Sequence, residues 1–231
     1  MRQFLVATIF TCFNLLNGGY VFAAPVLMLS SDPADRVGAG NSVEITIGVS
    51  GLDPDVDLGA YSFDFYFTNT ANPFVTGSNF TFGGMLGDRP GINTLRGADL
   101  PPKLKGDGIT YEIGFIYEVS LLDATALHNL QKDKNGTFDL VSIRLDTLYF
   151  NEPANRNLGI VASNFVLSDG QGDSIPSVYK IMPDGSLRLF DTNDVVLSKS
   201  ITVVPEPTIL SLIIFGLIGI RFNNWRSKQM K

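Results

Sequence analysis

Residues 58–67 read Leu-Gly-Ala-Tyr-Ser-Phe-Asp-Phe-Tyr-Phe, and this stretch decides the fold class. Large side chains at Tyr61, Phe63, Phe65 and Phe67 recur at every second position, with Ser62, Asp64 and Tyr66 between them. A period of two places alternate side chains on opposite faces of an extended chain, so the first set is predicted to be buried and the second to face water. The stretch therefore predicts a β-strand that covers a hydrophobic core.

The same alternation continues on either side of this strand. Residues 43–49 place Val43, Ile45, Ile47 and Val49 on one face. Residues 109–119 predict a third strand, with Ile109, Tyr111, Ile113, Phe115, Tyr117 and Val119 on the buried face and Thr110, Glu112 and Glu118 on the other. Shorter apolar runs predict further strands at residues 26–29, 138–150, 160–167, 178–182 and 186–190, the last two joined by the turn Pro183-Asp184-Gly185.

One segment departs from the strand pattern. Residues 121–131 carry Leu122, Ala126, Leu127 and Leu130 at near-helical spacing, which predicts a single short helix. Many strands, turns rich in Gly, Pro and Asp, and one helix indicate an all-β fold of the two-sheet sandwich or jelly-roll type. Neither an internal repeat nor a hydrophilic linker divides residues 24–203, so these residues are predicted to form one domain.

This region resembles the cohesin-like modules, a β-sandwich family related to carbohydrate-binding domains. The resemblance rests on four segments: residues 43–49, Ser50-Gly51-Leu52, residues 58–65, and residues 127–131 leading into Phe138-Asp139-Leu140. It implies a nine-stranded sandwich. Such sandwiches serve as binding, scaffold and matrix modules, and the fold alone does not choose among these roles.

The first 23 residues have the features of a secretory signal peptide. Arg2 precedes an apolar run from Phe4 to Phe13, and Ala23 and Ala24 offer small residues for cleavage, with Ala23 preferred. The apolar run is too short to span about 30 Å of hydrocarbon. Because the only cysteine, Cys12, lies in this removable segment, the mature chain is predicted to have no disulfide and no cysteine-ligated metal.

The other end of the chain, residues 204–231, has three parts in order. Val204-Pro205-Glu206-Pro207 comes first; the two prolines keep the residues before them out of the helical region, so the tetrapeptide is predicted to be extended. An apolar run from Thr208 to Ile220 follows. Helix from residue 205 to residue 222 would span about 27 Å, and the basic residues behind it would keep the C-terminus in the cytoplasm: Arg221, Arg226, Lys228 and Lys231.

These three parts, in this order at the very end of the chain, resemble the PEP-CTERM sorting domain of exported bacterial proteins. The resemblance implies processing near the proline-glutamate-proline motif by an exosortase, an integral membrane enzyme of Gram-negative bacteria that make extracellular polysaccharide. It also implies that the chain is held in the inner membrane only transiently and then reaches the cell surface or the medium. Exosortase and the membrane are thus expected partners.

The net charge of the predicted domain limits which other partners are expected. Residues 24–204 hold 12 Lys and Arg against 22 Asp and Glu, a net charge of −10, which argues against nucleic acid. Exopolysaccharide or another envelope protein is the expected partner. The chain is expected to be a binding or structural module rather than an enzyme; the alternative is a carbohydrate-active enzyme on the same sandwich, which would need a pair of carboxylates in a cleft.

Few residues suggest catalysis or metal binding. His128 is the only histidine, and it lies in the predicted helix, which does not favour a serine or cysteine triad. No cofactor is expected, with calcium as the one open alternative. Asp53, Asp55 and Asp57 alternate in one loop, and carboxylate oxygens are the ligands that calcium prefers. Two other turns offer acidic side chains: Asp169 and Asp173 around Gly170-Gln171-Gly172, and Asp133-Lys134-Asn135-Gly136.

Exposed aromatic rings would mark a sugar-binding face, because a ring pairs an apolar surface with polar edges. Tyr66, Phe74, Phe80 and Phe82 lie in or near the segment after residues 58–67, and most of them are predicted to belong to the core. The only tryptophan, Trp225, lies in the basic tail, where a role at the membrane interface is expected.

Overall fold

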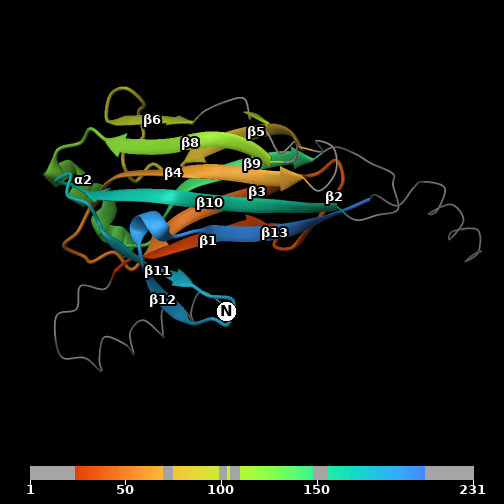
Figure 1. Ribbon diagram of the computed structural model, residues 1–231. Coiled ribbons are helices and arrows are strands. Elements are labelled where there is room, and N and C mark those ends of the chain that lie inside the picture. The colour runs from red at the N-terminus through yellow and green to blue at the C-terminus, as the bar shows by residue number, and fades with distance from the viewer. Residues whose placement is uncertain (1–23, 70–74, 99–102, 105–109, 148–155, 206–231) are drawn as a thin grey trace, which may run out of the picture.

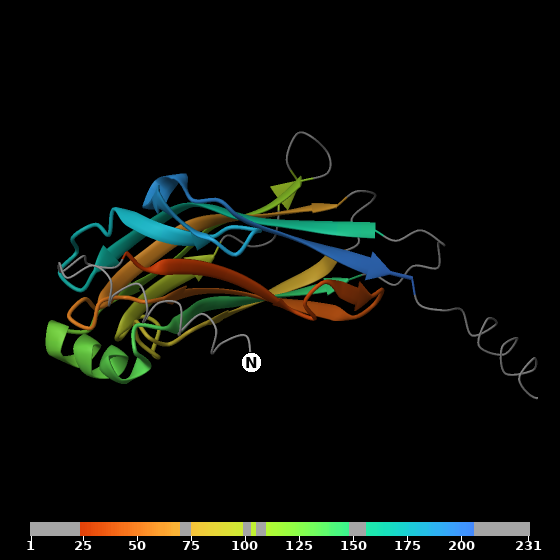
Figure 2. The same ribbon diagram turned by 90° about the horizontal axis from the view of Figure 1, so that it is seen from below.

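The computed structural model describes residues 24–69, 75–98, 103–104, 110–147 and 156–205. These residues form two β-sheets that lie face to face, as Figure 1 and, from below, Figure 2 show. The strands are β1 Val26–Asp32, β2 Arg36–Gly38, β3 Ser42–Ser50, β4 Leu58–Asn69, β5 Val75–Phe82, β6 Thr94–Ala98, β7 Lys103–Leu104, β8 Thr110–Ser120, β9 Phe138–Thr147, β10 Arg156–Asp169, β11 Ser177–Ile181, β12 Leu187–Asp191 and β13 Leu197–Val204. The predicted two-sheet sandwich is confirmed.

One sheet has six strands in the order β12-β11-β1-β3-β9-β5. The other has seven, in the order β2-β13-β10-β4-β8-β6, with β7 also paired to β8. Most neighbours are antiparallel, whereas β1 with β11 and β13 with β2 are parallel. The resemblance implied nine strands, but the described residues alone hold thirteen, because short strands at the sheet edges extend both layers.

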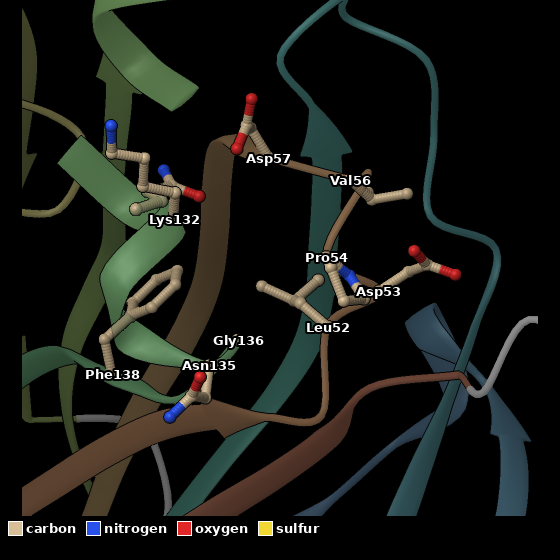
Figure 3. A pocket seen from close by; sticks show the side chains of 10 residues that line it. Leu52, Asp53, Pro54, Val56, Asp57, Lys132, Asn135, Gly136 and Phe138 are labelled. Carbon is tan, nitrogen blue, oxygen red and sulfur yellow. The ribbon is translucent and has the colours of Figure 1, made fainter. Parts of the chain in front are cut away.

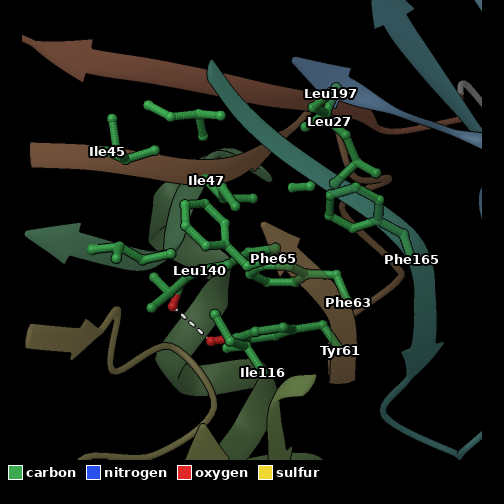
Figure 4. Packing of buried hydrophobic residues seen from close by; sticks show 14 of the residues in the cluster. Leu27, Ile45, Ile47, Tyr61, Phe63, Phe65, Ile116, Leu140, Phe165 and Leu197 are labelled. Atoms are coloured by element: carbon green, nitrogen blue, oxygen red, sulfur yellow. Dashed lines mark hydrogen bonds between the residues drawn. The ribbon is translucent and has the colours of Figure 1, made fainter. Parts of the chain in front are cut away.

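The inner faces of β3 and β4 build the core, as their alternation predicted. Val43, Ile45, Ile47 and Val49 are buried, and so are Tyr61, Phe63, Phe65 and Phe67. Figure 4 shows several of these side chains, among them Ile47, Phe63 and Phe65, packed between the sheets. The rings of Phe63 and Phe165 stack with their centroids 5.1 Å apart, and the Tyr61 hydroxyl reaches across the sandwich to the Leu140 carbonyl oxygen at 2.7 Å. The two sheets therefore share one continuous core.

The predicted faces of β8 are wrong from Phe115 onward. Ile116 and Glu118 point inward and are buried, whereas Phe115 and Val119 are exposed on the outer surface. The cause is a shift in the pairing of β4 with β8 next to Gly114, whose φ of 89° lies in the left-handed region. A bulge of this kind adds one residue and exchanges the two faces of the strand beyond it.

Several predicted boundaries move by a few residues. The segment at 138–150 is a strand to Thr147, with 148–150 outside the described residues, and the segment at 160–167 is the longer β10. Strands β1, β11 and β12 fall on three predicted segments, Ile109 lies outside the described part, and five strands were not predicted: β2, β5, β6, β7 and β13.

The predicted helix is present but shorter, as α2 Ala124–Gln131. It begins at Asp123, whose carboxylate accepts a hydrogen bond from the Ala126 amide at 2.8 Å and so satisfies one of the free N–H groups of the first turn. At its other end the buried Gln131 amide binds both backbone groups of Leu58, each at 2.8 Å. This contact ties the helix to the start of β4.

Glu118 belongs to a cluster of polar side chains at the edge of the core. Tyr61 and Thr94 place hydroxyls 3.1 and 3.2 Å from its two carboxylate oxygens, and an Arg96 guanidinium nitrogen lies 3.8 Å away. Burial raises the pKa of Glu118 above its usual range, against the smaller lowering effects of these hydroxyls and of Arg96. The same burial, together with the nearby carboxylate, raises the pKa of the Tyr61 hydroxyl. The site therefore favours the protonated form of Glu118 more than water does.

Candidate functional site

The outer face of the seven-stranded sheet carries an exposed apolar strip formed by Leu95, Phe115, Tyr117 and Val119. Leu95 and Phe115 are each 49% exposed and Val119 is 38% exposed. The rings of Phe115 and Tyr117 stack with their centroids 5.7 Å apart. Exposed apolar side chains that adjoin one another are a feature of binding surfaces, since water solvates them poorly.

The pairing of the strands makes this strip continuous. Leu95 on β6 lies opposite Val119 on β8, and Gly97 lies opposite Tyr117. A Cβ at Gly97 would stand 2.8 Å from the Tyr117 ring, so glycine at this position leaves room for the ring where it lies beside β6. Two further exposed apolar residues stand just beyond the ends of these strands: Ile92, 71% exposed, before β6, and Leu121, 47% exposed, after β8.

A polar group lies directly beside the strip. Asp64 on β4 is the pairing partner of Phe115 on β8, and its carboxylate accepts hydrogen bonds from the Tyr66 hydroxyl at 3.1 Å and from the Asn164 amide at 2.6 Å. Asn164 sits at a shift in the pairing of β10 with β4 and has a φ of 54°. Ring, carboxylate and amide thus occupy three adjacent strands of one surface, β8, β4 and β10, which face the viewer in Figure 1.

The outer face of the other sheet has the opposite character. On β3 and β9, Ser42 pairs with Asp146, Glu44 with Arg144 and Thr46 with Ser142. The Ser42 hydroxyl donates to the Asp146 carboxylate at 2.6 Å, and the Arg144 guanidinium nitrogen Nε lies 3.1 Å from it; both hold the pKa of Asp146 below its usual range. The outer face of β3 and β9 thus satisfies its own polar groups, and the exposed apolar side chains of this sheet lie apart from it, at Ile181, Leu187 and Leu189 on β11 and β12.

Of the aromatic residues singled out in the sequence, Tyr66 lies on the outer face beside Asp64. Phe80 and Phe82 pack against the core, as predicted, and Phe74 lies outside the described residues. Phe115 and Tyr117 were assigned to the core by their alternation. The signal that could have placed them is Gly114, because a glycine inside a strand pattern often marks a bulge.

The acidic loop at Asp53, Asp55 and Asp57 does not bring its three carboxylates to one point. The Asp53 carboxylate accepts a hydrogen bond from the Asp55 amide at 2.9 Å, and the Asp57 carboxylate lies 3.2 Å from the Nδ1 of His128. Likewise, the Asp169 carboxylate binds the amides of Gln171 and Asp173 within its own turn. Within the described ranges, no three Asp, Glu, His or Cys side chains are grouped closely enough to hold a metal ion.

A small hollow lies between this loop and the end of α2. Its volume is about 70 Å³, and Leu52, Pro54 and Phe138 form its apolar wall. Figure 3 shows the carboxylates of Asp53 and Asp57 pointing to different sides of it. Clefts that hold small ligands are usually about 300 to 1,000 Å³, so this hollow does not accommodate a sugar ring between paired carboxylates.

The two ends of the chain lie mostly outside the described residues. Val204 is the last residue of β13, where its carbonyl oxygen accepts a hydrogen bond from the Ala39 amide at 2.8 Å, so the four-residue motif begins where the sheet ends. The described part of the chain holds no helix long and apolar enough to cross a membrane. Residues 1–23, with Cys12 and Ala23, and residues 206–231, with the apolar run and the basic tail, are not among the described residues.

Comparison with known proteins finds similarity in solved structures only. No protein-family model matches the sequence, and no curated protein matches it. A cohesin module from a family 33 glycoside hydrolase of Clostridium perfringens is similar over 80% of this chain and 99% of its own, at 15% identity and a TM-score of 0.42. A type II cohesin from Bacteroides cellulosolvens is similar over 64% of this chain and 89% of its own, at 14% identity and a TM-score of 0.40.

A third similar structure is an enzyme. AvmM, which catalyses macrocyclisation in alchivemycin A biosynthesis, is similar over 80% of this chain and 92% of its own, at 11% identity and a TM-score of 0.33. The similarities concern the mostly-β sandwich architecture, and at these scores they carry no argument about activity.

Proposed function

We propose that this chain is an exported, non-enzymatic module of the bacterial envelope or matrix, which binds its partner through the outer face of β4, β6 and β8. The apolar strip carries this proposal. Leu95 and Phe115 keep about half, and Val119 more than a third, of their surface in contact with water on the outer face of this sheet. Burying such side chains against a partner would remove their apolar surface from water and so stabilise the complex.

The route to the envelope is proposed from the sequence. The N-terminal signal directs export, the C-terminal apolar run and basic tail hold the chain in the inner membrane, and an exosortase acts at Pro205-Glu206-Pro207. The motif follows immediately on Val204, the end of the last strand, so cleavage there would leave every described strand intact.

The acidic loop at residues 53–57 and the small hollow beside α2 favour binding over catalysis. A glycosidase needs two carboxylates about 5 to 10 Å apart across a sugar-sized cleft. The hollow beside α2 has a volume of about 70 Å³, and its lining carboxylates point apart. Among the described residues, His128 has Asp57 as its polar side-chain neighbour and no hydroxyl to activate.

The binding face can be tested with two matched double variants. Leu95→Ser with Val119→Ser removes two side chains that are 49% and 38% exposed on the strip; Leu187→Ser with Leu189→Ser removes two that are 38% and 51% exposed on β12 of the other sheet. We expect the first pair to lower the affinity for isolated envelopes about tenfold or more, because losing the two contacts together should cost about 1.4 kcal/mol or more.

The β12 pair should bind like the parent protein. Co-sedimentation with envelopes, with thermal unfolding to verify that each variant is folded, measures both. Equal losses in the two double variants would mean that exposed apolar area in general, and not this face, causes retention.

A further inference from the structure

The backbone, and not chance contacts between side chains, sets where the polar side chains beside the strip lie. Asn164 lies in the middle of β10 and yet has a φ of 54°, a conformation that costs a non-glycine residue free energy. The bulge presents its exposed side chain on the outer face, where the amide donates to Asp64 at 2.6 Å. Bulges of this kind re-aim side chains and are enriched beside binding sites.

The spacing of Phe115 and Asp64 matches one sugar ring, and Asn164 stands one strand further on. Phe115, Asp64 and Asn164 lie on adjacent strands, and neighbouring strands are about 4.8 Å apart, close to the width of a pyranose ring. A ring stacked on the exposed face of Phe115 would therefore carry its hydroxyls over Asp64 and Asn164. A carboxylate accepts hydrogen bonds only, whereas an amide both donates and accepts, so the pair can bind neighbouring hydroxyls of one sugar.

A protein partner would use the apolar side chains but would not need the polar pair. The Tyr66 hydroxyl donates a second hydrogen bond, at 3.1 Å, to the Asp64 oxygen that Asn164 binds, so the carboxylate is fixed before any ligand arrives. Fixing polar groups in advance reduces the entropy lost on binding. The aromatic residue and the preset polar pair together favour a carbohydrate over a purely apolar protein surface.

Charge narrows the carbohydrate further. Residues 24–204 have a net charge of −10, and Asp64 places a carboxylate in the site itself. An acidic polysaccharide would be repelled both by the whole domain and by this group. A neutral chain avoids this repulsion.

We infer that Phe115, Asp64 and Asn164 form a binding site for a neutral polysaccharide. This inference rests on the proposed function, since it names the ligand of the same face. Tyr117 continues the ring surface along β8, with its centroid 5.7 Å from that of Phe115, and so extends contact to the next sugar of a chain. The flat, open surface suits an extended polymer better than a free monosaccharide, because each sugar makes only a few contacts there.

The experiment uses the full-length chain in mild non-ionic detergent. Its probes are insoluble cellulose and chitin, soluble glucomannan and dextran, the neutral polysaccharide extracted from the producing bacterium, and alginate as an acidic comparison. Phe115→Ala removes the exposed ring, and Asn164→Gly removes the amide while glycine accepts the positive φ. We expect binding to at least one neutral polysaccharide and none to alginate, with each variant weakening it about tenfold.

Two matched controls lie elsewhere on the surface. Leu189→Ala truncates a side chain that is 51% exposed, compared with 49% for Phe115, and Asn135→Gly removes an asparagine with a φ of 51°, compared with 54° for Asn164. Both should leave polysaccharide binding within about twofold of the parent.

The outcomes separate this inference from the proposed function. Polysaccharide binding that Phe115→Ala and Asn164→Gly leave unchanged overturns the site. If no neutral polysaccharide binds while the Leu95 and Val119 double variant still loses envelope binding, the partner is a protein: the inference falls and the proposed function stands. If the parent binds neither polysaccharide nor envelope, both fall.

Discussion

Phe65→Ala should lower the free energy of unfolding by about 3 to 5 kcal/mol, the range for removing a buried aromatic ring. Phe65 is fully buried in the middle of β4. Its cross-strand partners are Gly114 on β8 and Ala162 on β10, both too small to fill the space that the ring would leave. Because the site cannot collapse, the loss is expected toward the upper end. Urea denaturation followed by fluorescence or circular dichroism measures it.

Phe115→Ala is the matched control in the same sheet. Its ring is 49% exposed, so its removal should cost less than about 1 kcal/mol. A loss below about 1 kcal/mol for Phe65→Ala would mean that the inner face of β4 is misassigned, and a large loss for Phe115→Ala would mean the same for β8.

Glu206→Ala should slow C-terminal processing while export and membrane insertion continue. The substitution removes the one carboxylate of the motif but leaves both prolines, the apolar run and the basic tail unchanged. In the proposed route the prolines would keep the motif extended, whereas the apolar run and basic tail would hold the chain in the membrane, so recognition and retention would be separate tasks. A full-length form should therefore accumulate in the membrane fraction.

Two epitopes, one before Val204 and one after Met230, follow both forms on immunoblots of membrane and released fractions. Glu44→Ala is the control, since it removes an exposed carboxylate from β3 and should be processed like the parent. Neutralising Arg221, Arg226, Lys228 and Lys231 together should instead weaken retention and release unprocessed chain. Loss of the C-terminal epitope from Glu206→Ala at the parent rate would show that the motif is only a linker.

Alternation predicted the central strands because their two environments differ sharply. In the alternating runs of β3 and β4 every second side chain enters the core. The bulges within these runs place their extra residues on the partner strands β8, β9 and β10, so the period of two is preserved on β3 and β4. The short helix was predictable for a similar reason, since its apolar spacing departs from the period of the surrounding strands.

Two of the strands that were not predicted, β6 and β13, have polar residues at inward positions. On β6 the inward side chains are Thr94 and Arg96, which surround Glu118 and break any apolar alternation. On β13, Lys199 occupies a position between the buried Leu197 and Ile201, and its ammonium lies 3.7 Å from Asp35. A polar residue inside a strand can pair with a residue far away in the sequence. The sequence alone does not show this partner, so such a residue looks like part of a loop.

The candidate site was hidden by backbone geometry. The alternation along residues 109–119 is regular, and it predicted Phe115 and Val119 as core residues. The bulge at Gly114 turned them outward and turned Glu118 inward. In the same way, the bulge at Asn164 decides which residue stands beside Asp64. The residue types of the site could therefore be read from the sequence, but their common face could not.

Photo-crosslinking in living cells tests the binding face most directly. A photoreactive phenylalanine analogue at position 115 replaces a ring that is 49% exposed on the strip, and the same analogue at position 189 replaces a side chain that is 51% exposed on β12. If the outer face of the seven-stranded sheet is the binding surface, position 115 should give a higher-mass adduct and position 189 should give none. Adducts from position 189 alone, or from neither position in envelopes that retain the protein, would contradict it.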